Sequence, residues 1–278
     1  MTIQTRDQFW NALGNNSTRI VIDKASLSNT ALGQIHSLWR ATGQPGQGTI
    51  PGAAAACINT TVGALGFTQQ TAPATSYLGI LEGLCSNAGT TLEIHDRLVA
   101  SGNMSGVVTT AQTGFDLATF LASNNIDARK GDANYSDVQW WLEWYTDTGA
   151  SAVTATVNAL FNDASSANLT AISLAATRRA SLMIPLNGLI GAAQAGRFIQ
   201  GINSVTLSAT TGTAGAFGIT ATRYRAAMYK PIASARFTQN AMDLGFPEIN
   251  NSACLQVVQI AATTTTGIVR ATGKIIHG

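Results

Sequence analysis

Residues 138–160 read VQWWLEWYTDTGASAVTATVNAL, and this stretch decides the fold class. Apolar and polar residues alternate before Asp147–Gly149, and the same two-residue period resumes after it. Because successive side chains point to opposite faces of a β-strand, this period predicts two strands. The Asp/Gly turn between them favours an antiparallel hairpin. The stretch offers packing surface and no chemical motif, which points to a structural protein.

The pattern of strand, glycine-bearing turn and strand occurs twice more. The turns of these two further predicted hairpins are Gly212–Gly215 and Thr263–Gly267, and another strand is predicted over residues 91–99. Strands at this density are typical of sandwiches and jelly rolls. The sequence therefore predicts a mainly β fold, with an antiparallel β-sandwich or jelly-roll-like domain over residues 90–278.

The first 89 residues have a different character and predict a short helical and extended arm region. Thr5–Gln8 is a capping box, which predicts a short helix from that point. Apolar residues with helical spacing predict a second helix over residues 28–41. A short helix is also predicted over residues 76–86, although the two glycines in it oppose a helix.

Residues 43–75 form a long irregular segment rich in Gly, Pro and Thr. Such a long loop is uncommon in a compact monomer. It is either an arm that lies on a neighbouring subunit or a loose surface loop, and the sequence leaves both open. In the first case, apolar residues such as Ile50 and Phe67 gain order only through contact with the neighbour.

The composition favours association with other copies. Charged residues make up 11% of the 278, against roughly 25% in typical soluble domains. Uncharged surfaces suit strands that pack against other subunits, since each buried charge needs a partner. A secreted β-protein with a low-charge surface is the alternative. The net charge of +2 argues against nucleic-acid binding, and so do the scattered basic residues, whose pairs at 178–179 and at 223 and 225 form no run.

Cysteine usage and the chain ends predict an origin in a cytoplasm. Cys57, Cys85 and Cys254 are too few and too far apart for a disulfide framework, and we expect them to be small buried hydrophobes. The first residues form no apolar signal segment, and no run of 18 apolar residues predicts a membrane span.

Histidines and carboxylates predict no catalytic centre, no metal site and no cofactor. His36 and His277 are isolated, and we expect His36 on the surface or at an interface. Glu93 and His95 share a strand face, but no third ligand lies nearby, so His95 is predicted to be structural. A carboxylate pair that meets only in the fold stays open as an alternative. The carboxylates to test first are Glu93, Asp96 and Glu143.

The tryptophan-rich strand has two different faces. Trp140 and Trp144 share one face with Leu142 and are predicted to lie in the core. Trp141 and Tyr145 share the other face, where they fill the core or a subunit interface, since aromatic residues are enriched at interfaces. Stacking of a sugar on these two rings is the alternative.

Several segments together resemble a family of virion structural proteins of tailed bacteriophages. The similarity runs from about residue 30 to the end, and its motifs are not chemically diagnostic. The resemblance implies a component of a phage particle, with capsid decoration as the preferred role, and it carries over no catalytic residue. The segments are SLWRATGQPG (37–46), GALGF (63–67), IHDRL (94–98), TTAQT (109–113), WLEWYT (141–146) and VTLSATTGTAG (205–215).

The sequence thus predicts a non-enzymatic virion protein, made in the host cytoplasm, that binds other copies of itself and phage capsid proteins. A major capsid or tail protein is the alternative within the same class. A carbohydrate-binding or carbohydrate-degrading host-attachment domain is the alternative of another class, and it requires Trp141 and Tyr145 to be exposed. The predicted subunit-interface residues are Trp39, Pro45, Ile50, Phe67, Trp141 and Tyr145.

Overall fold

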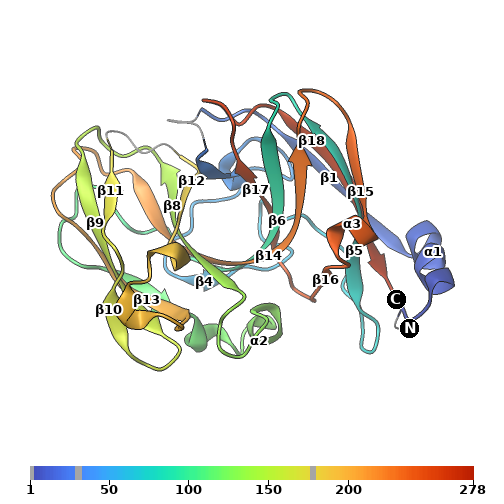
Figure 1. Ribbon diagram of the computed structural model, residues 1–278, viewed down its shortest axis with the longest axis horizontal. Helices are drawn as coiled ribbons and strands as arrows, with labels where there is room; N and C mark the ends of the chain where they lie inside the picture. The colour runs from blue at the N-terminus through green and yellow to red at the C-terminus, as the bar shows by residue number, and fades with distance from the viewer. Residues whose placement is uncertain (1–2, 29–32, 176–179) are drawn as a thin grey trace. The chain divides into compact units, whose positions relative to one another are not determined.

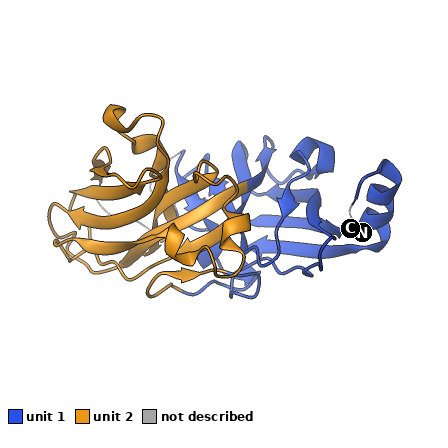
Figure 2. Ribbon diagram, turned by 90° about the horizontal axis from the view of Figure 1, so that it is seen from below, with its two compact units in different colours: residues 1–49, 58–96, 225–278 blue, residues 50–57, 97–224 orange. Residues whose placement is uncertain are grey.

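The computed structural model describes residues 3–28, 33–175 and 180–278 (Figure 1). The chain forms two compact units, which Figure 2 distinguishes by colour. Both are built mainly of antiparallel strands, which confirms the predicted fold class. The units do not follow the boundary predicted between residues 89 and 90, because strands near the two ends of the chain pair with each other. Unit 1 comprises residues 1–49, 58–96 and 225–278, and unit 2 comprises residues 50–57 and 97–224.

Unit 1 contains a six-stranded sheet of order β15-β5-β18-β1-β3, with β16 also paired to β5. A second group places β17 between β2 and β6. Side chains from both groups, such as Ile20 of β1 and Val258 of β17, are buried. The elements that contribute residues to unit 1 are α1 (Arg6–Asn15), β1 (Ser17–Lys24), β2 (Ile35–Ser37), β3 (Gly43–Gln44), β5 (Ser76–Cys85), β6 (Thr90–Ala100), β14 (Ala216–Lys230), β15 (Phe237–Asn240), α3 (Ala241–Leu244), β16 (Glu248–Ile249), β17 (Leu255–Ile260) and β18 (Val269–His277).

Unit 2 contains a sheet of order β10-β9-β13-β7, with β11 also paired to β9, and a group in which β8 lies between β14 and β12. The strands β6 and β14 cross the division of the chain and contribute residues to both units. The remaining elements of unit 2 are β4 (Ala55–Ala56), β7 (Gln112–Asp116), α2 (Ile126–Arg129), β8 (Val138–Thr146), β9 (Val153–Phe161), β10 (Ser166–Asn168), β11 (Ile172–Leu174), β12 (Leu182–Pro185) and β13 (Ile199–Leu207).

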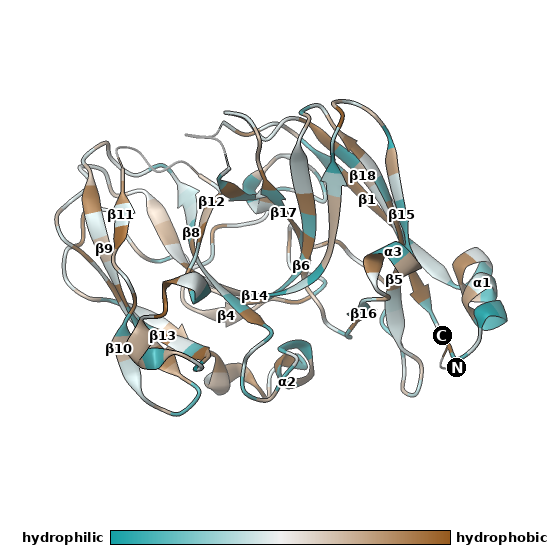
Figure 3. Ribbon diagram, in the orientation of Figure 1, coloured by the Kyte–Doolittle hydropathy of each residue, from teal (hydrophilic) through white to brown (hydrophobic). Residues whose placement is uncertain are grey.

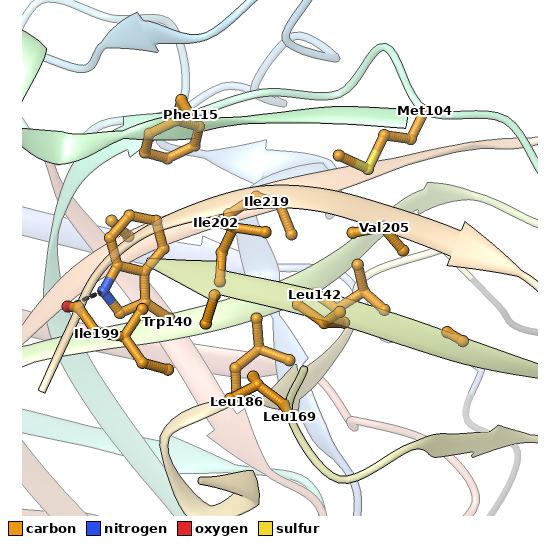
Figure 4. Packing of buried hydrophobic residues seen from close by; sticks show 14 of the residues in the cluster. Met104, Phe115, Trp140, Leu142, Leu169, Leu186, Ile199, Ile202, Val205 and Ile219 are labelled. Atoms are coloured by element: carbon orange, nitrogen blue, oxygen red, sulfur yellow. Dashed lines mark hydrogen bonds between the residues drawn. The ribbon is translucent and has the colours of Figure 1, made fainter. Parts of the chain in front are cut away.

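The core of unit 2 is filled by side chains from both of its sheets, which makes the unit a sandwich (Figure 4). Trp140 of β8 contributes its ring, and its indole Nε1 donates to the Ile199 carbonyl of β13 at 2.8 Å. Trp144 stacks on Phe217 of β14 with ring centroids 5.2 Å apart. Figure 3 shows how hydrophobic residues recur along the strands of both units. The prediction that Trp140 and Trp144 belong to the core is confirmed.

All three predicted hairpins have the expected strands but different partners. β8 pairs with β14 and β12, whereas β9 pairs with β13, β10 and β11. In the second predicted hairpin, β13 pairs with β7 and β9, whereas β14 pairs with β8. In the third, β17 pairs with β2 and β6, whereas β18 pairs with β1 and β5. The hairpin prediction is therefore wrong. Each turn carries the chain from one sheet to the other, because the apolar faces of consecutive strands face each other across the core.

Two of these turns pack against each other within unit 2. The backbone N–H of Gly149 donates to the Thr211 hydroxyl at 3.2 Å, and that of Ser151 donates to the Thr211 carbonyl at 3.1 Å. A Cβ atom on Gly149 would lie 1.9 Å from the Thr211 carbonyl oxygen. Glycine is therefore required here for the close approach of two corners, and not for a hairpin turn.

The first predicted helix is confirmed and the second is wrong where the structure describes it. Thr5 and Gln8 form the capping box that begins α1. Residues 35–37 instead form β2, which pairs with β17, and a 3₁₀ turn follows over Leu38–Arg40. Residues 29–32, near the expected start of this helix, lie outside the described residues, as does the basic pair at 178–179. Strand pairing with β17 overrides the helical spacing of the apolar residues.

The third predicted helix is also wrong, since residues 76–85 form β5. A Cβ atom on Gly79 would lie 2.8 Å from the Ile276 side chain, and one on Gly83 would lie 2.7 Å from the Arg270 carbonyl. Both contacts are with β18, the neighbouring strand. The glycines that oppose a helix thus mark a close approach of side chain and backbone in a sheet.

Residues 43–75 are irregular apart from β3 and β4, as predicted. Parts of the segment are held by the chain's own residues. The Gly48 N–H donates to the Trp39 carbonyl at 2.8 Å, and the Leu65 N–H donates to the Leu255 carbonyl at 2.9 Å. Dependence of the segment's order on a neighbouring subunit stays a prediction, to be tested by comparing hydrogen exchange in the isolated and assembled chain.

Candidate functional site

The second face of β8 is as deeply buried as the first. Trp141 is 4% exposed, and Glu143 and Tyr145 are almost fully buried. Trp141 donates through its indole Nε1 to the Thr222 hydroxyl at 2.8 Å. β8 lies between two strands of its sheet, and the side chains on both of its faces are buried. This burial contradicts the exposed aromatic pair that the carbohydrate alternative requires, and it places both rings in the core.

Glu143 lies at the centre of a buried polar cluster in unit 2, formed with Arg97, Tyr145 and Thr220. The Arg97 guanidinium lies 2.8 Å from Glu143 Oε2, and both side chains are fully buried. Arg97 also donates to the Tyr145 hydroxyl at 2.7 Å. The Tyr145 hydroxyl donates to Glu143 Oε2 at 3.1 Å, and the Thr220 hydroxyl donates to the same oxygen. The ionised pair is therefore supported by two neutral hydroxyls.

Burial dominates the electrostatics of this cluster. It raises the pKa of Tyr145 far above the ordinary value, with a further upward contribution from Glu143 that Arg97 opposes. The phenol therefore stays protonated and donates. All four side chains are at most 1% exposed, so no dissolved substrate reaches them. The geometry fits a buried ion pair that specifies how β6, β8 and β14 come together.

A second buried arginine supports the first. Arg129, in α2, is fully buried and donates to the Arg97 carbonyl at 2.9 Å. It also donates to the Cys57 carbonyl at 2.8 Å. One guanidinium thereby joins α2, β6 and the segment that follows β4. Neither arginine stood out in the sequence, because a lone arginine in a strand or a polar loop carries no pattern.

Glu93 and His95 share a face of β6, as predicted, and His95 Nε2 lies 2.8 Å from Glu93 Oε2. Asp96 points to the other side and accepts from the Cys254 N–H at 2.8 Å. Among the residues that the structure describes, no group of three His, Cys, Asp or Glu is placed to hold a metal ion. Glu93 and His95 form a part-buried hydrogen-bonded contact between two residues on the same face of one strand.

The other two histidines are buried as well, which corrects the expected surface position of His36. His36 lies on β2, and burial lowers its pKa from 6.5 to about 4. His277 lies between two hydroxyls, with Ser76 Oγ 2.9 Å from Nδ1 and Thr18 Oγ1 2.8 Å from Nε2. Burial lowers the pKa of His277 too.

The six predicted interface residues divide by exposure. Trp39, Phe67, Trp141 and Tyr145 are buried against their own chain, as are the three cysteines, none of which is disulfide-bonded. Pro45 is half-buried, and its carbonyl accepts from the Lys24 ammonium at 2.7 Å. Ile50 is exposed. An interface role for the six stays a prediction, and Pro45 and Ile50 are the two with accessible surface to contribute.

A different apolar surface lies in unit 1, around α1 and α3. We call it the α1–α3 patch, and it surrounds a hollow of about 450 Å³. Trp10 is 60% exposed, Met242 78% and Phe246 45%. The capping box at Thr5–Gln8 predicts the helix that carries Phe9 and Trp10, but it predicts no role for the two rings. The signal available there was an aromatic pair on a short helix, without a partner nearby in sequence. The residues of the patch are Ile3, Phe9, Trp10, Tyr77, Met242, Phe246 and Ile276.

Comparison with known proteins gives distant matches only. No protein-family model matches the sequence, and no curated protein matches it. T=1 particles derived from infectious bursal virus match at 10% identity over 94% of this chain and 77% of that chain, with a TM-score of 0.19. The VP2 subviral particle of infectious bursal disease virus matches at 9% identity over 94% and 79%, with a TM-score of 0.18. Scores this low establish neither a shared fold nor a shared function.

Among the described residues, no helix is long and apolar enough to cross a membrane.

Proposed function

We propose that this chain is a structural protein of a tailed-bacteriophage virion that binds other subunits and stabilises the capsid as a decoration protein. The observation that carries the proposal is the α1–α3 patch, where large apolar side chains are exposed on a chain with 11% charged residues. Contiguous exposed apolar surface marks a site of interaction. The resemblance of residues 37–46 and 205–215 to phage virion proteins supports the placement in a particle.

The buried polar cluster supports a structural role over an enzymatic one. Arg97 and Glu143 are fully buried and paired with each other. Buried ion pairs of this kind contribute to the specificity of a fold in some proteins. Because Arg97 and Glu143 are buried, they cannot contact another subunit. We therefore assign subunit binding to side chains on the surface.

The test is the composition of purified virions of the virus that encodes the chain. We expect mass spectrometry to detect the chain, and an electron cryomicroscopy map to place it on the outside of a shell built by another protein. Added to shells that lack it, the purified chain should bind and raise their resistance to heat. A chain that forms the shell itself would favour the major-capsid alternative. Its absence from virions would contradict the proposal.

A further inference from the structure

The α1–α3 patch combines a hollow with projecting side chains. Phe9 packs edge-on against Trp10, with ring centroids 5.5 Å apart, and against Phe246 at 5.6 Å. These contacts fix the aromatic walls of the hollow. Met242 and Trp10 stand out of the same surface, since they are 78% and 60% exposed. The hollow of about 450 Å³ lies within the range that binds drug-sized molecules or inserted side chains.

Charged side chains of both signs lie beside the hollow, among them the exposed Asp243 of α3 next to the lining residue Met242. Arg6 contributes the charged side chain among the lining residues, and Asp7 follows it on α1. Their side chains are 86% and 93% exposed and lie 3.9 Å apart, so both remain available to another molecule. A partner of one strong charge would meet one attractive and one repulsive group. A copy of the same surface, turned by a two-fold axis, can offer an acid to the arginine and a base to the aspartate.

We propose that the α1–α3 patch is a two-fold interface between two copies of this chain. In a two-fold contact the same surface serves on both sides, so it must be complementary to itself. This surface meets that requirement twice, because it carries a hollow beside projecting apolar side chains, and a positive beside a negative side chain. The inference rests on the proposed function, because it names the surface through which the structural protein binds itself.

Trp10 is the expected centre of binding. Tryptophan is enriched among the few residues that dominate interface energy, and methionine adapts to irregular surfaces. Truncating such a residue weakens association by roughly 30-fold or more. Because Trp10 is 60% exposed in the single chain, its loss should leave the fold intact.

The first experiment is sedimentation of the full-length chain over a range of concentrations. The wild type should be a dimer, and Trp10→Ala should weaken dimerisation roughly 30-fold. Met242→Gln serves as a second variant, for the case that Trp10→Ala perturbs α1. Ile232→Ala is the matched control, since Ile232 is 64% exposed and lies outside the patch. Circular dichroism checks the fold of each variant. Equal weakening by Ile232→Ala would overturn the assignment of the surface.

The second experiment tests the two-fold arrangement through the charges. Arg6→Asp and Asp7→Arg should each weaken self-association, because like charges then face each other across the axis. A mixture of the two variants should form a mixed dimer, because each acid meets a base again. Weakening in both variants without recovery in the mixture would overturn the two-fold arrangement. Salt should reduce these charge effects.

Two further outcomes would overturn the inference while leaving the proposed function standing. One is a wild type that stays monomeric at every concentration and yet binds shells. The other is a monomer that binds the dye anilinonaphthalene sulfonate and loses this binding in Trp10→Ala, which would assign the hollow to a small apolar ligand. Absence of the chain from virions, together with a dimer that Trp10→Ala disrupts, would instead overturn only the proposed function.

Discussion

The two faces of β8 are buried to the same degree by different means. One face places Trp140, Leu142 and Trp144 in an apolar core, where burial and close packing supply the stability. The other face places Glu143 in an ion pair with Arg97, where the favourable interaction must offset the loss of water around two charges. The buried fraction of a side chain therefore does not show by which interaction the side chain stabilises the fold. An apolar residue contributes by its own volume, whereas each member of the polar cluster depends on its partners.

The apolar face should be the more sensitive to a single truncation. Trp140→Ala should lower the free energy of unfolding by about 5 kcal/mol, the upper end for a large buried aromatic residue. The reason is that the substitution also leaves the Ile199 carbonyl without its indole donor. Denaturant unfolding measures the change. Trp10→Ala is the control, and we expect it to change stability by less than about 1 kcal/mol because Trp10 is exposed.

On the polar face, a single substitution should lower the stability, and a second substitution of its partner should restore most of it. Glu143→Leu should destabilise by about 4 kcal/mol, since it leaves the Arg97 guanidinium buried without its carboxylate. Arg97→Met with Glu143→Leu should recover most of this loss, because two apolar side chains need no ionic partner. A double-mutant cycle on unfolding free energies measures the coupling. Additive effects would show that the pair does not act as a unit.

Buried His36 should make the stability of the fold depend on pH. Neither ring nitrogen of His36 has a hydrogen-bond partner among the described residues. Burial lowers its pKa from 6.5 to about 4. Above pH 6.5 the ring is neutral in both states and contributes no pH dependence. Between pH 6.5 and 4 the unfolded chain binds a proton that the folded chain does not, so stability should fall by roughly 3 kcal/mol.

Urea unfolding across this pH range tests the expectation. A His36→Leu variant should lose this part of the acid destabilisation, whatever its stability at neutral pH. If the variant and the wild type lose stability in parallel between pH 6.5 and 4, another group is responsible.

The smallest effect is expected at His95, a buried histidine whose Nε2 lies 2.8 Å from Glu93 Oε2. His95→Gln keeps much of the volume and a hydrogen-bonding group beside Glu93, so it should cost about 1 kcal/mol. Assembly into particles should survive the change. Loss of metal content or of an enzymatic activity at unchanged stability would count against the structural interpretation.

The strands could be predicted from the sequence, but their pairing could not. A two-residue period reports that one face of a strand is apolar, and it does so correctly for β8, β9, β17 and β18. It does not report whether the next strand lies beside the first or across the core. Turn residues such as Gly149 fit both arrangements, because each needs a compact backbone. Which strands pair is decided by contacts between residues far apart in the sequence.

The candidate surfaces were harder to predict for a related reason. The alternation around Trp141 and Tyr145 shows two faces, but only the folded structure shows that both are buried. His36 was placed on a helix because its neighbours have helical spacing, whereas pairing of β2 with β17 buries it. The α1–α3 patch combines residues from both ends of the sequence, Trp10 with Met242 and Phe246, so no local pattern could reveal it.

The division of the chain sets an order for folding during synthesis. Unit 2 is complete once residue 224 has been made, whereas the sheet of unit 1 requires β18, the strand between β5 and β1 at the very end of the sequence. Consecutive strands do not pair at the three turns, so none of these turns forms a local hairpin that could hold its strands early, and pairing across long sequence separations is slow. We therefore expect unit 2 to form while the chain is still on the ribosome. Unit 1 should close only once β18 has been made, with the edges of β1 and β5 unpaired until then and open to pairing with other chains.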